Sequence, residues 1–318
     1  MSARVPLPLP LGWYCVADEA ELLPGALARV RYFGQELVLW RGDDGEPHLF
    51  DAYCPHLGAH LGVGGKVEGS ALRCPFHFWK FDGSGRCIEI PYAKRIPPKA
   101  AASAWPIRRR NGLIFAWYDP AGGAPRFELP EVPEWGSPEW TAPEVRSFEV
   151  RTHPQEMAEN IVDAVHFRFV HGTPEIPPMQ ARIEGLEFHA FQGLTFTTPQ
   201  GETPGRVDVR MFGPGFGVTR FQGVVETLLM ITGVPLEPEL HRTTIRFIVR
   251  KIAGNDEATR GVARAFVAEI ARQYAQDIPI WESKRYLERP LLCDGDGPIL
   301  ELRRYFQQFY PPRSGDVL

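Results

Sequence analysis

Two short motifs each place a cysteine close to a histidine. Cys54-x-His56 lies in the segment AYCPHLGAHLGVGGKV, and Cys74-x-x-His77 lies in RCPFHFWKFDGSGRC. Two thiolates and two imidazoles suffice for a four-coordinate metal ion, or for a two-iron, two-sulfide cluster with cysteines on one iron and histidines on the other. Neutral imidazoles raise the reduction potential of such a cluster, which can then pass single electrons onward. The motifs therefore predict an electron-transfer centre.

A zinc site is the alternative for the same four ligands. Zinc sites more often contain a pair of cysteines separated by two to four other residues, whereas each motif here has one cysteine and one histidine. We therefore favour the iron–sulfur cluster. His60 is near enough in sequence to replace a ligand, but its position between two apolar residues favours a buried or supporting role. Four glycines permit a tight loop whose N–H groups are free to face sulfur: Gly58, Gly62, Gly64 and Gly65.

A second group combines two histidines with a carboxylate. In HPQEMAENIVDAVHFRFVHGTPE, Asp163, His166 and His171 lie at the end of a predicted helix over residues 155–170. Asp163 and His166 share one helical face, so the acid can bond an imidazole. His171 lies about 140° around an unbroken helix. Both imidazoles can therefore bind one metal ion only if the helix ends, as the Gly and Pro that follow indicate.

Two histidines and one carboxylate are the ligand set of non-haem Fe(II) sites with positions open for O₂. A second helix, predicted over residues 256–276, carries an apolar stripe that includes Phe266 and Ile270, and Asp277 lies within about 20° of them. A carboxylate directed at a core needs a cation or a proton. We therefore predict Asp277 as the third ligand, with Glu282 and Glu269 as alternatives because helical phase is a weak guide near a proline.

The pattern around these motifs predicts two kinds of fold. Short β-rich runs alternate with turn signals between residues 30 and 118, which indicates a small all-β domain over residues 1–118. Residues 119–143 are rich in proline and suit an extended connection. Hairpin-like runs and helices over residues 144–318 predict an antiparallel sheet with flanking helices, of helix-grip type. The expected class is α+β.

Composition narrows the function classes. The chain has 318 residues, a net charge of −4, and 44% hydrophobic residues, which argues against disorder and against a nucleic-acid partner. No run of about 18 apolar residues is present, and prolines interrupt the first residues, so neither a membrane span nor a signal peptide is expected. Five cysteines are too sparse for a disulfide scaffold. A cytoplasmic location is the simplest expectation.

The two Cys–His loops resemble the Rieske cluster-binding signature, and Asp163-x2-His166-x4-His171 resembles the mononuclear-iron segment of Rieske oxygenases. Longer segments, among them NGLIFAWY, QDIPIWESK and RPLLCDGDGP, are most similar to the oxygenase component of 3-ketosteroid 9α-hydroxylase and to Neverland-type cholesterol 7-desaturases. The resemblance implies an N-terminal Rieske [2Fe-2S] domain and a catalytic domain with mononuclear Fe(II). It also implies a monooxygenase that uses O₂ and external electrons to hydroxylate or desaturate a C–H position of a steroid, sterol or similar polycyclic compound.

The same resemblance implies a head-to-tail homotrimer in which Asp163 connects His77 of one chain to His166 of the next. Electrons would come from a ferredoxin and its reductase, or from a single reductase, because no Gly-x-Gly-x-x-Gly nucleotide signal follows a strand. A basic stretch without acids is a candidate docking surface for an acidic ferredoxin, although an ordinary solvated face explains it equally well: Lys94, Arg95, Lys99, Arg108, Arg109 and Arg110.

Two other functions stay open. The same machinery could hydroxylate or demethylate a non-steroidal aromatic or alicyclic compound. More remotely, the chain could be a non-enzymatic electron carrier or a zinc-binding module. Iron and acid-labile sulfide analysis separates the last class from the oxygenases, because only an oxygenase needs a mononuclear iron in addition to the cluster.

Overall fold

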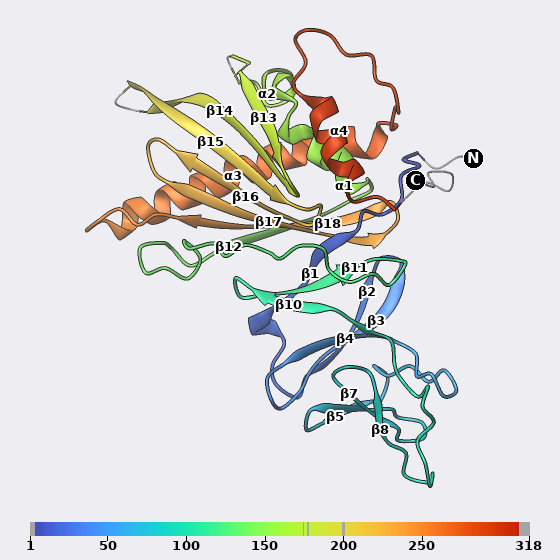
Figure 1. Ribbon diagram of the computed structural model, residues 1–318. Helices are drawn as coiled ribbons and strands as arrows, with labels where there is room; N and C mark the ends of the chain where they lie inside the picture. Colours follow the sequence, from blue (N-terminus) through green and yellow to red (C-terminus); the bar gives the residue numbers. More distant parts are fainter. Residues whose placement is uncertain (1–3, 174, 177, 199–200, 312–318) are drawn as a thin grey trace. The chain divides into compact units, whose positions relative to one another are not determined.

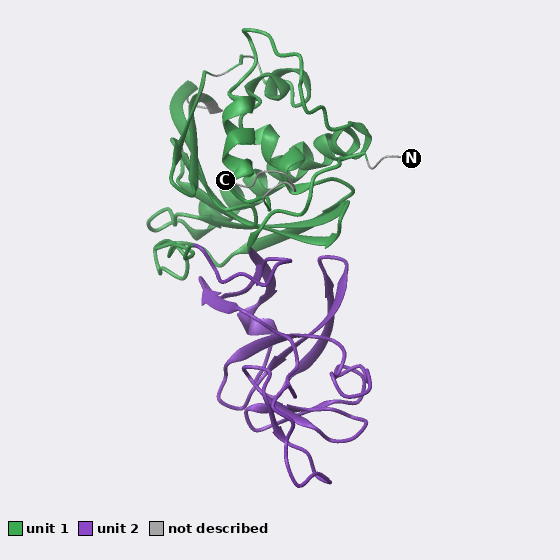
Figure 2. Ribbon diagram, turned by 45° about the vertical axis from the view of Figure 1, so that its right-hand side comes forward, with its two compact units in different colours: residues 1–12, 127–318 green, residues 13–126 purple. Residues whose placement is uncertain are grey.

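The computed structural model describes residues 4–173, 175–176, 178–198 and 201–311. It divides into two compact units, one of residues 13–126 and the other of residues 1–12 and 127–318 (Figure 2). Residues 4–12 join the second unit through hydrogen bonds from the Leu11 N–H to the Phe309 carbonyl, 2.6 Å, and from His153 Nε2 to the Pro8 carbonyl, 3.1 Å. The expected domain limits at residues 118 and 144 stay a prediction.

The unit of residues 13–126 is built from β-sheets, as the turn-rich sequence predicted. Its strands form the orders β1-β11-β10, β2-β3-β4-β9 and β5-β6-β7-β8. The Asn111-Gly112 turn joins two of them, with both residues at positive φ as the hairpin turn requires. The elements are β1 (Gly12–Asp18), the 3-10 helix η1 (Glu19–Glu21), β2 (Leu27–Tyr32), β3 (Gln35–Arg41), β4 (Pro47–Asp51), β5 (Lys66–Glu68), β6 (Ala71–Arg73), β7 (Lys80–Asp82), β8 (Cys87–Glu89), β9 (Ala104–Trp105), β10 (Ile107–Arg110) and β11 (Leu113–Tyr118).

One apolar core supports the two Cys–His loops of this unit. Trp40, Phe50 and Phe81 are fully buried in it, and the thiols of Cys54 and Cys74 belong to the same cluster of contacts. Burying a side chain of this size contributes about 1.5–3 kcal/mol. The cysteines are therefore held by the same packing that stabilises the sheets.

The second unit contains a large antiparallel sheet in the order β12-β18-β17-β16-β15-β14-β13 (Figure 1). The strands from β13 to β18 follow each other as hairpins, and β12 pairs with β18 at the other edge. The strands are β12 (Glu144–Val150), β13 (Met179–Glu184), β14 (Glu187–Thr198), β15 (Gly201–Phe212), β16 (Phe216–Gln222), β17 (Thr227–Glu237) and β18 (Leu240–Val249). The α+β class and the antiparallel sheet with flanking helices are confirmed.

Helices cover one face of this sheet (Figure 1). Val267 of α3 packs on Ile245 and Phe247, and Tyr305 of α4 packs on Phe188. The helical elements are α1 (Pro154–Ala158), the 3-10 helix η2 (Glu159–Ile161), α2 (Ala164–Phe169), α3 (Asp256–Ser283) and α4 (Ile299–Gln307). None of the described helices is long and apolar enough to cross a membrane.

Two helix predictions need correction. The prediction of one continuous helix over residues 155–170 is wrong. The helical backbone is interrupted between η2 and α2. Asp163 is the N-cap of α2, and its Oδ1 accepts hydrogen bonds from the N–H groups of Val165 and His166 at 3.2 and 3.3 Å. An aspartate can compete for backbone N–H groups in this way, which hydrophobic periodicity does not reveal. Helix α3 continues beyond residue 276, through Pro279, to Ser283.

Candidate functional site

The first candidate site is formed by the two Cys–His loops. Cys54 and Cys74 are 3% and 2% exposed, and the thiols interact with each other. Each loop is closed by a backbone hydrogen bond, from the Cys54 N–H to the Ala59 carbonyl at 2.9 Å and from the Cys74 N–H to the Trp79 carbonyl at 2.8 Å. Burial, together with the neighbouring Cys74 thiol, raises the pKa of Cys54 to about 12. Thiolates at this position therefore need a bound cation.

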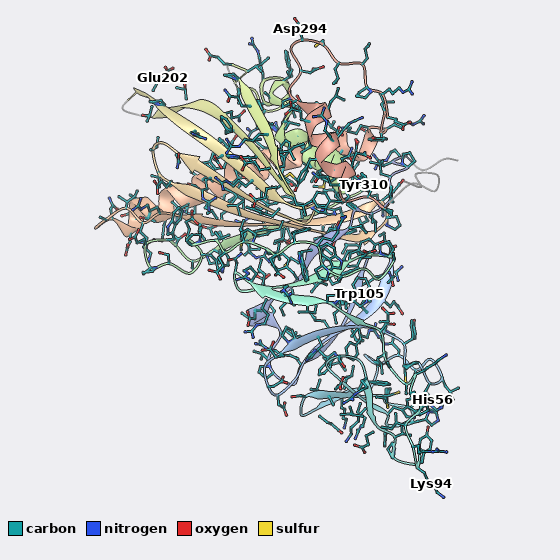
Figure 3. The ribbon with its side chains drawn as sticks, in the orientation of Figure 1. His56, Lys94, Trp105, Glu202, Asp294 and Tyr310 are labelled. Atoms are coloured by element: carbon teal, nitrogen blue, oxygen red, sulfur yellow. The ribbon has the colours of Figure 1, made fainter. Side chains whose placement is uncertain are left out.

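The two imidazoles of these loops lie side by side nearer the surface. The rings of His56 and His77 are half-buried, with centroids 4.7 Å apart. His56 stacks on Trp79 at 4.5 Å, and the indole N–H of Trp79 donates to the Tyr92 hydroxyl at 2.8 Å. Figure 3 shows His56 and Lys94 toward one end of this unit and Trp105 away from it. Buried thiols beside outer imidazoles fit a two-iron cluster with cysteines on the inner iron and histidines on the outer one.

Two further residues shape the first loop. His60 Nδ1 accepts the Gly62 N–H at 3.0 Å, and His60 Nε2 lies 3.8 Å from a Glu36 carboxylate oxygen. His60 thus supports its own loop. A Cβ atom on Gly65 would lie 1.9 Å from the Leu61 carbonyl oxygen, so no larger residue fits there without a shift of the backbone.

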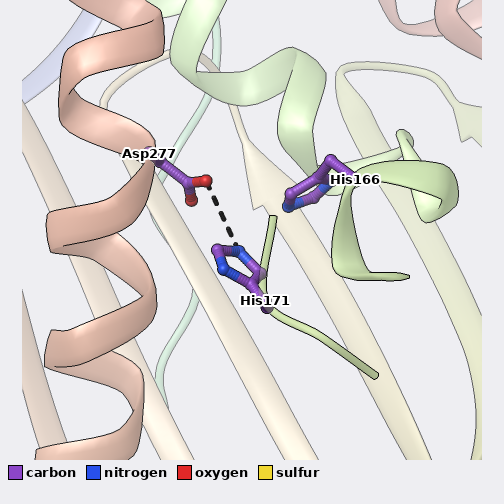
Figure 4. Close-up of side chains that lie close together, drawn as sticks. All are labelled: His166, His171 and Asp277. Atoms are coloured by element: carbon purple, nitrogen blue, oxygen red, sulfur yellow. Dashed lines mark ion pairs between the residues drawn. The ribbon is translucent and has the colours of Figure 1, made fainter. Parts of the chain in front are cut away.

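The second candidate site brings together His166, His171 and Asp277, whose ligand atoms all lie within 4.8 Å of one another. Figure 4 shows the three side chains directed toward one another from α2, from the segment after α2 and from α3. His171 Nε2 is 3.4 Å from Asp277 Oδ1, and the two imidazole centroids are 5.0 Å apart. Helix α2 ends at Phe169, which gives His171 the freedom that an unbroken helix would deny it.

Both histidines of this group already use one ring nitrogen. His166 Nδ1 bonds the main-chain carbonyl of Asp163, and His171 Nδ1 bonds the Gln276 side-chain oxygen at 3.0 Å. Because a carbonyl oxygen only accepts, both Nδ1 atoms must donate. In a neutral imidazole with this hydrogen bond, Nε2 carries the lone pair, which is the arrangement found in metal-binding histidines.

The electrostatics of the group favour a cation. Burial raises the pKa of Asp277 and lowers the pKa of His166, and nearby Asp163 only partly offsets the effect on His166. A divalent cation bound beside Asp277 would offset the free-energy cost of burying its charged carboxylate. Asn160 bonds the Asp277 carboxylate, and its Oδ1 accepts the Trp281 indole N–H at 3.2 Å. The donor set fits non-haem Fe(II).

The other carboxylates considered as candidates bond other partners. Glu269 pairs with Arg272 at 2.6 Å, and Glu282 accepts the Arg151 N–H at 3.0 Å. Asp163 is 39% exposed, with Oδ2 3.9 Å from His166 Nδ1. Sequence reasoning gave no role to Asn160 or Gln276, and no signal in the sequence reveals which distant side chains they contact.

A close contact braces the turn that holds Asp163. A Cβ atom on Gly297 would lie 1.7 Å from the Val162 carbonyl oxygen and 3.7 Å from the Ala164 nitrogen. The segment before α4 therefore lies directly against the backbone on either side of Asp163. Arg303 ties the same segment down, because it donates to the Leu287 carbonyl at 2.6 Å and to Glu159 at 2.8 and 3.2 Å.

Comparisons with known proteins match both parts of the chain to known families. Residues 12–101 match the family described as the Rieske [2Fe-2S] domain, and residues 116–310 match the 3-ketosteroid 9α-hydroxylase C-terminal domain. The chain is 34% identical to a probable 3-ketosteroid-9-alpha-monooxygenase oxygenase component of Rhodococcus rhodochrous, over 94% of this chain and 79% of the relative. It is 30% identical to a cholesterol 7-desaturase of Xenopus laevis, over 100% of this chain and 75% of the relative.

Solved structures share the fold. Apo dicamba monooxygenase superposes with a TM-score of 0.72 at 19% identity, covering 94% of this chain and 96% of the other. Pseudomonas putida CBB5 NdmA, as a mutant with caffeine, gives a TM-score of 0.73 at 21% identity, covering 93% of this chain and 89% of the other.

Proposed function

The chain belongs to the Rieske non-haem iron oxygenases that have a 3-ketosteroid 9α-hydroxylase C-terminal domain, and we propose that its substrate is a steroid, a sterol or a similar polycyclic compound. It is an O₂-dependent monooxygenase whose cofactors are a [2Fe-2S] cluster and a mononuclear iron. The observation that supports the proposed active site is the convergence of His166, His171 and Asp277 with both Nδ1 atoms already bonded.

We assign the ligands residue by residue. The proposed cluster ligands are Cys54, His56, Cys74 and His77, and the proposed iron ligands are His166, His171 and Asp277. When bound, the cluster supplies electrons one at a time and the iron supplies the activation of O₂. The overall hydroxylation consumes one C–H bond, O₂, two electrons and two protons, and yields an alcohol and water. A desaturation instead removes a second hydrogen from the neighbouring carbon, so that the same O₂, two electrons and two protons yield an alkene and two water molecules.

Asp163 is the proposed connection between the two centres. Its carbonyl orients His166, while its carboxylate is exposed enough to contact another chain. In the proposed head-to-tail homotrimer this carboxylate lies between His77 of one chain and His166 of the next. A short polar path of this kind is needed because electrons from the cluster can support the reaction only if they reach the mononuclear iron.

The surroundings of Asp277 support an apolar substrate. Phe266, Ile270 and Tyr274 lie on the same side of α3 and belong to one apolar cluster with Leu229, Ile245 and Phe247 of the sheet. The carboxylate therefore follows an apolar stripe that faces the sheet. Such an environment keeps water away from a reacting C–H bond. The steroid and sterol names of the relatives favour a fused-ring compound.

The relatives are named oxygenase components, so a separate electron-transfer partner is required. We propose a ferredoxin with its reductase, or a single reductase. The cytoplasmic location expected from the sparse cysteines stays a prediction.

A product screen tests the substrate class. The chain, loaded with iron and cluster, is supplied with a generic ferredoxin and reductase, and is offered steroids, sterols and non-steroidal aromatic compounds. We expect mass spectra to show a gain of one oxygen or a loss of two hydrogens on a polycyclic substrate. Turnover of aromatic compounds alone would favour the second candidate, which the dicamba and caffeine neighbours suggest. A purified chain with zinc, or with a cluster and no further iron, would leave only the electron-carrier or zinc-module alternatives.

A further inference from the structure

We infer that Gln276 is a positioning residue that fixes the ring tautomer of His171 and so keeps Nε2 of that histidine available to iron. The inference rests on the proposed iron site. Gln276 directly precedes Asp277 on α3, and its Oε1 lies 3.0 Å from His171 Nδ1. The His171 side chain is only 1% exposed, so water has little access to complete its hydrogen bonds.

The orientation of the Gln276 amide decides which nitrogen of His171 carries the proton. An oxygen facing Nδ1 accepts a proton from it and leaves a lone pair on Nε2. An amide turned by 180° would present its NH₂ group instead. Nδ1 would then accept, Nε2 would carry the hydrogen, and the nitrogen nearest Asp277 would have no lone pair for a metal ion.

Arg272 holds the amide in the first orientation. Its Nη1 donates to the same Gln276 oxygen at 2.8 Å, and its Nε and Nη2 donate to Glu269 at 2.9 and 2.6 Å. An arginine side chain has donors only, so the atom that faces both Arg272 and His171 must be an acceptor. Glu269, Arg272 and Gln276 thus form the α3 hydrogen-bond chain, which runs along the helix to a proposed ligand.

The two histidines differ in how they are held. The partner of His166 Nδ1 is a main-chain carbonyl, which a side-chain substitution leaves in place. The partner of His171 is a side chain on the exposed part of α3. Only the second can therefore be tested by substitution. If Gln276 were truncated, a water molecule could take over as the acceptor for His171 Nδ1. The informative substitution therefore replaces Gln276 with an apolar side chain of similar size.

The test measures Fe(II) binding to the chain with its cluster intact. Under anaerobic conditions, Fe(II) is titrated against a competing chelator, and nitric oxide serves as a spectroscopic probe of the ferrous site. We expect Gln276→Leu to weaken Fe(II) binding roughly 10–100-fold, the usual effect of removing the partner of a ligand histidine. Gln276→Glu keeps an acceptor and should bind iron nearly as the parent does. Gln273→Leu is the matched control, because the Gln273 amide donates to Glu269 at 2.8 Å and not to His171.

A double substitution separates orientation from general damage to the helix. Arg272→Met frees the amide to turn and should weaken Fe(II) binding in the parent chain. In the Gln276→Glu background it should have no effect, because a carboxylate has two acceptors and cannot present a donor. Equal losses in both backgrounds would overturn the inference, as would parent-like binding by Gln276→Leu.

His171→Ala distinguishes this inference from the proposed function. If His171→Ala loses the iron while Gln276→Leu retains it, the role of Gln276 is refuted and the iron site stands. If His171→Ala binds Fe(II) as the parent does, the iron-site assignment itself fails. Cluster absorbance and thermal unfolding, measured on each variant, identify any that fold incorrectly.

Discussion

Nε2 of His171 lies 3.4 Å from Oδ1 of Asp277, and these side chains are 1% and 10% exposed. A carboxyl group buried to this extent favours its protonated form, and burial does raise the pKa of Asp277 despite the two neighbouring imidazoles. Below this raised pKa, iron can bind the carboxylate only after the carboxyl has lost its proton.

We predict that Fe(II) affinity falls as pH is lowered through the raised pKa of Asp277. Below that pKa, each binding event releases one proton from the carboxyl, so the affinity should drop by about tenfold per pH unit. Burial lowers the pKa of His166, so this histidine should stay neutral at pH values where a free histidine is protonated. Anaerobic Fe(II) titrations across the pH range measure the slope. An affinity that is constant down to the pKa of a free aspartate would contradict the prediction.

Asp277→Asn should have opposite effects on iron binding and on stability. A group whose pKa is raised on folding contributes stability at low pH and loses it as pH rises through the folded value. The neutral amide removes that loss, so the iron-free variant should unfold at a higher temperature than the parent at pH 8, with little difference at pH 4. It should retain the cluster and lose the mononuclear iron. Thermal unfolding and metal analysis check both effects.

Asp163→Asn should separate electron transfer from iron binding. Asparagine retains the oxygen that caps α2, whereas alanine would remove the cap at a cost of about 1 kcal/mol and disturb His166. We expect the Asn variant to bind both cofactors but to turn over much more slowly, because the charged link between the two centres is lost. The readout is the rate at which the pre-reduced cluster is oxidised with O₂ and substrate. A parent-like rate would remove Asp163 from the path.

Gly65→Ala should prevent assembly of the cluster. The added Cβ would lie 1.9 Å from the Leu61 carbonyl, inside the loop that carries Cys54 and His56. We expect most chains to lack acid-labile sulfide and visible absorbance, while the mononuclear iron still binds. Gly69→Ala is the control, because Gly69 has open space around it and only its positive φ opposes a side chain, at about 1–2 kcal/mol. Similar sulfide loss in both variants would refute the steric explanation.

Within the candidate docking stretch for an electron donor, Lys94, Arg95 and Lys99 are all exposed. Arg109 is already paired with two acids of its own unit. We expect Lys94→Glu combined with Arg95→Glu to raise the apparent KM for an acidic ferredoxin by about tenfold and to weaken its dependence on salt. Arg86→Glu, an exposed charge reversal outside this loop, should change neither quantity. An unchanged KM in the double variant would show that Lys94 and Arg95 do not contact the ferredoxin.

Residue spacing in the sequence correctly predicted those features that depend on residues close together in the chain. The Cys–His motifs lie on tight loops, and the turn residues between them sit where hairpins require them. Helical phase also predicted that Asp277 faces inward, and it is buried. The roles of these residues as ligands stay predictions, but their positions followed from short-range geometry alone.

Other features depend on contacts that the sequence does not encode locally. The same helical phase that buries Asp277 leaves Gln276 exposed, and an exposed glutamine on a helix is usually unremarkable. Its significance comes from His171, which reaches it from another part of the chain. Likewise, Asp163 begins a new helical segment directly after η2, because its carboxylate competes for backbone N–H groups, which an apolar pattern cannot show.

The contact between Gly297 and the Val162 carbonyl has a consequence for how such enzymes can diversify. Arg303 secures one part of the 284–298 segment and this contact secures the other, while Leu291 between them is fully exposed. Insertions and exchanges near Leu291 should be tolerated, because they need not displace either anchor. A side chain at position 297 would instead push on the turn that carries Asp163. Chimaeras that graft a foreign segment here should therefore keep the glycine and vary only the residues between the anchors.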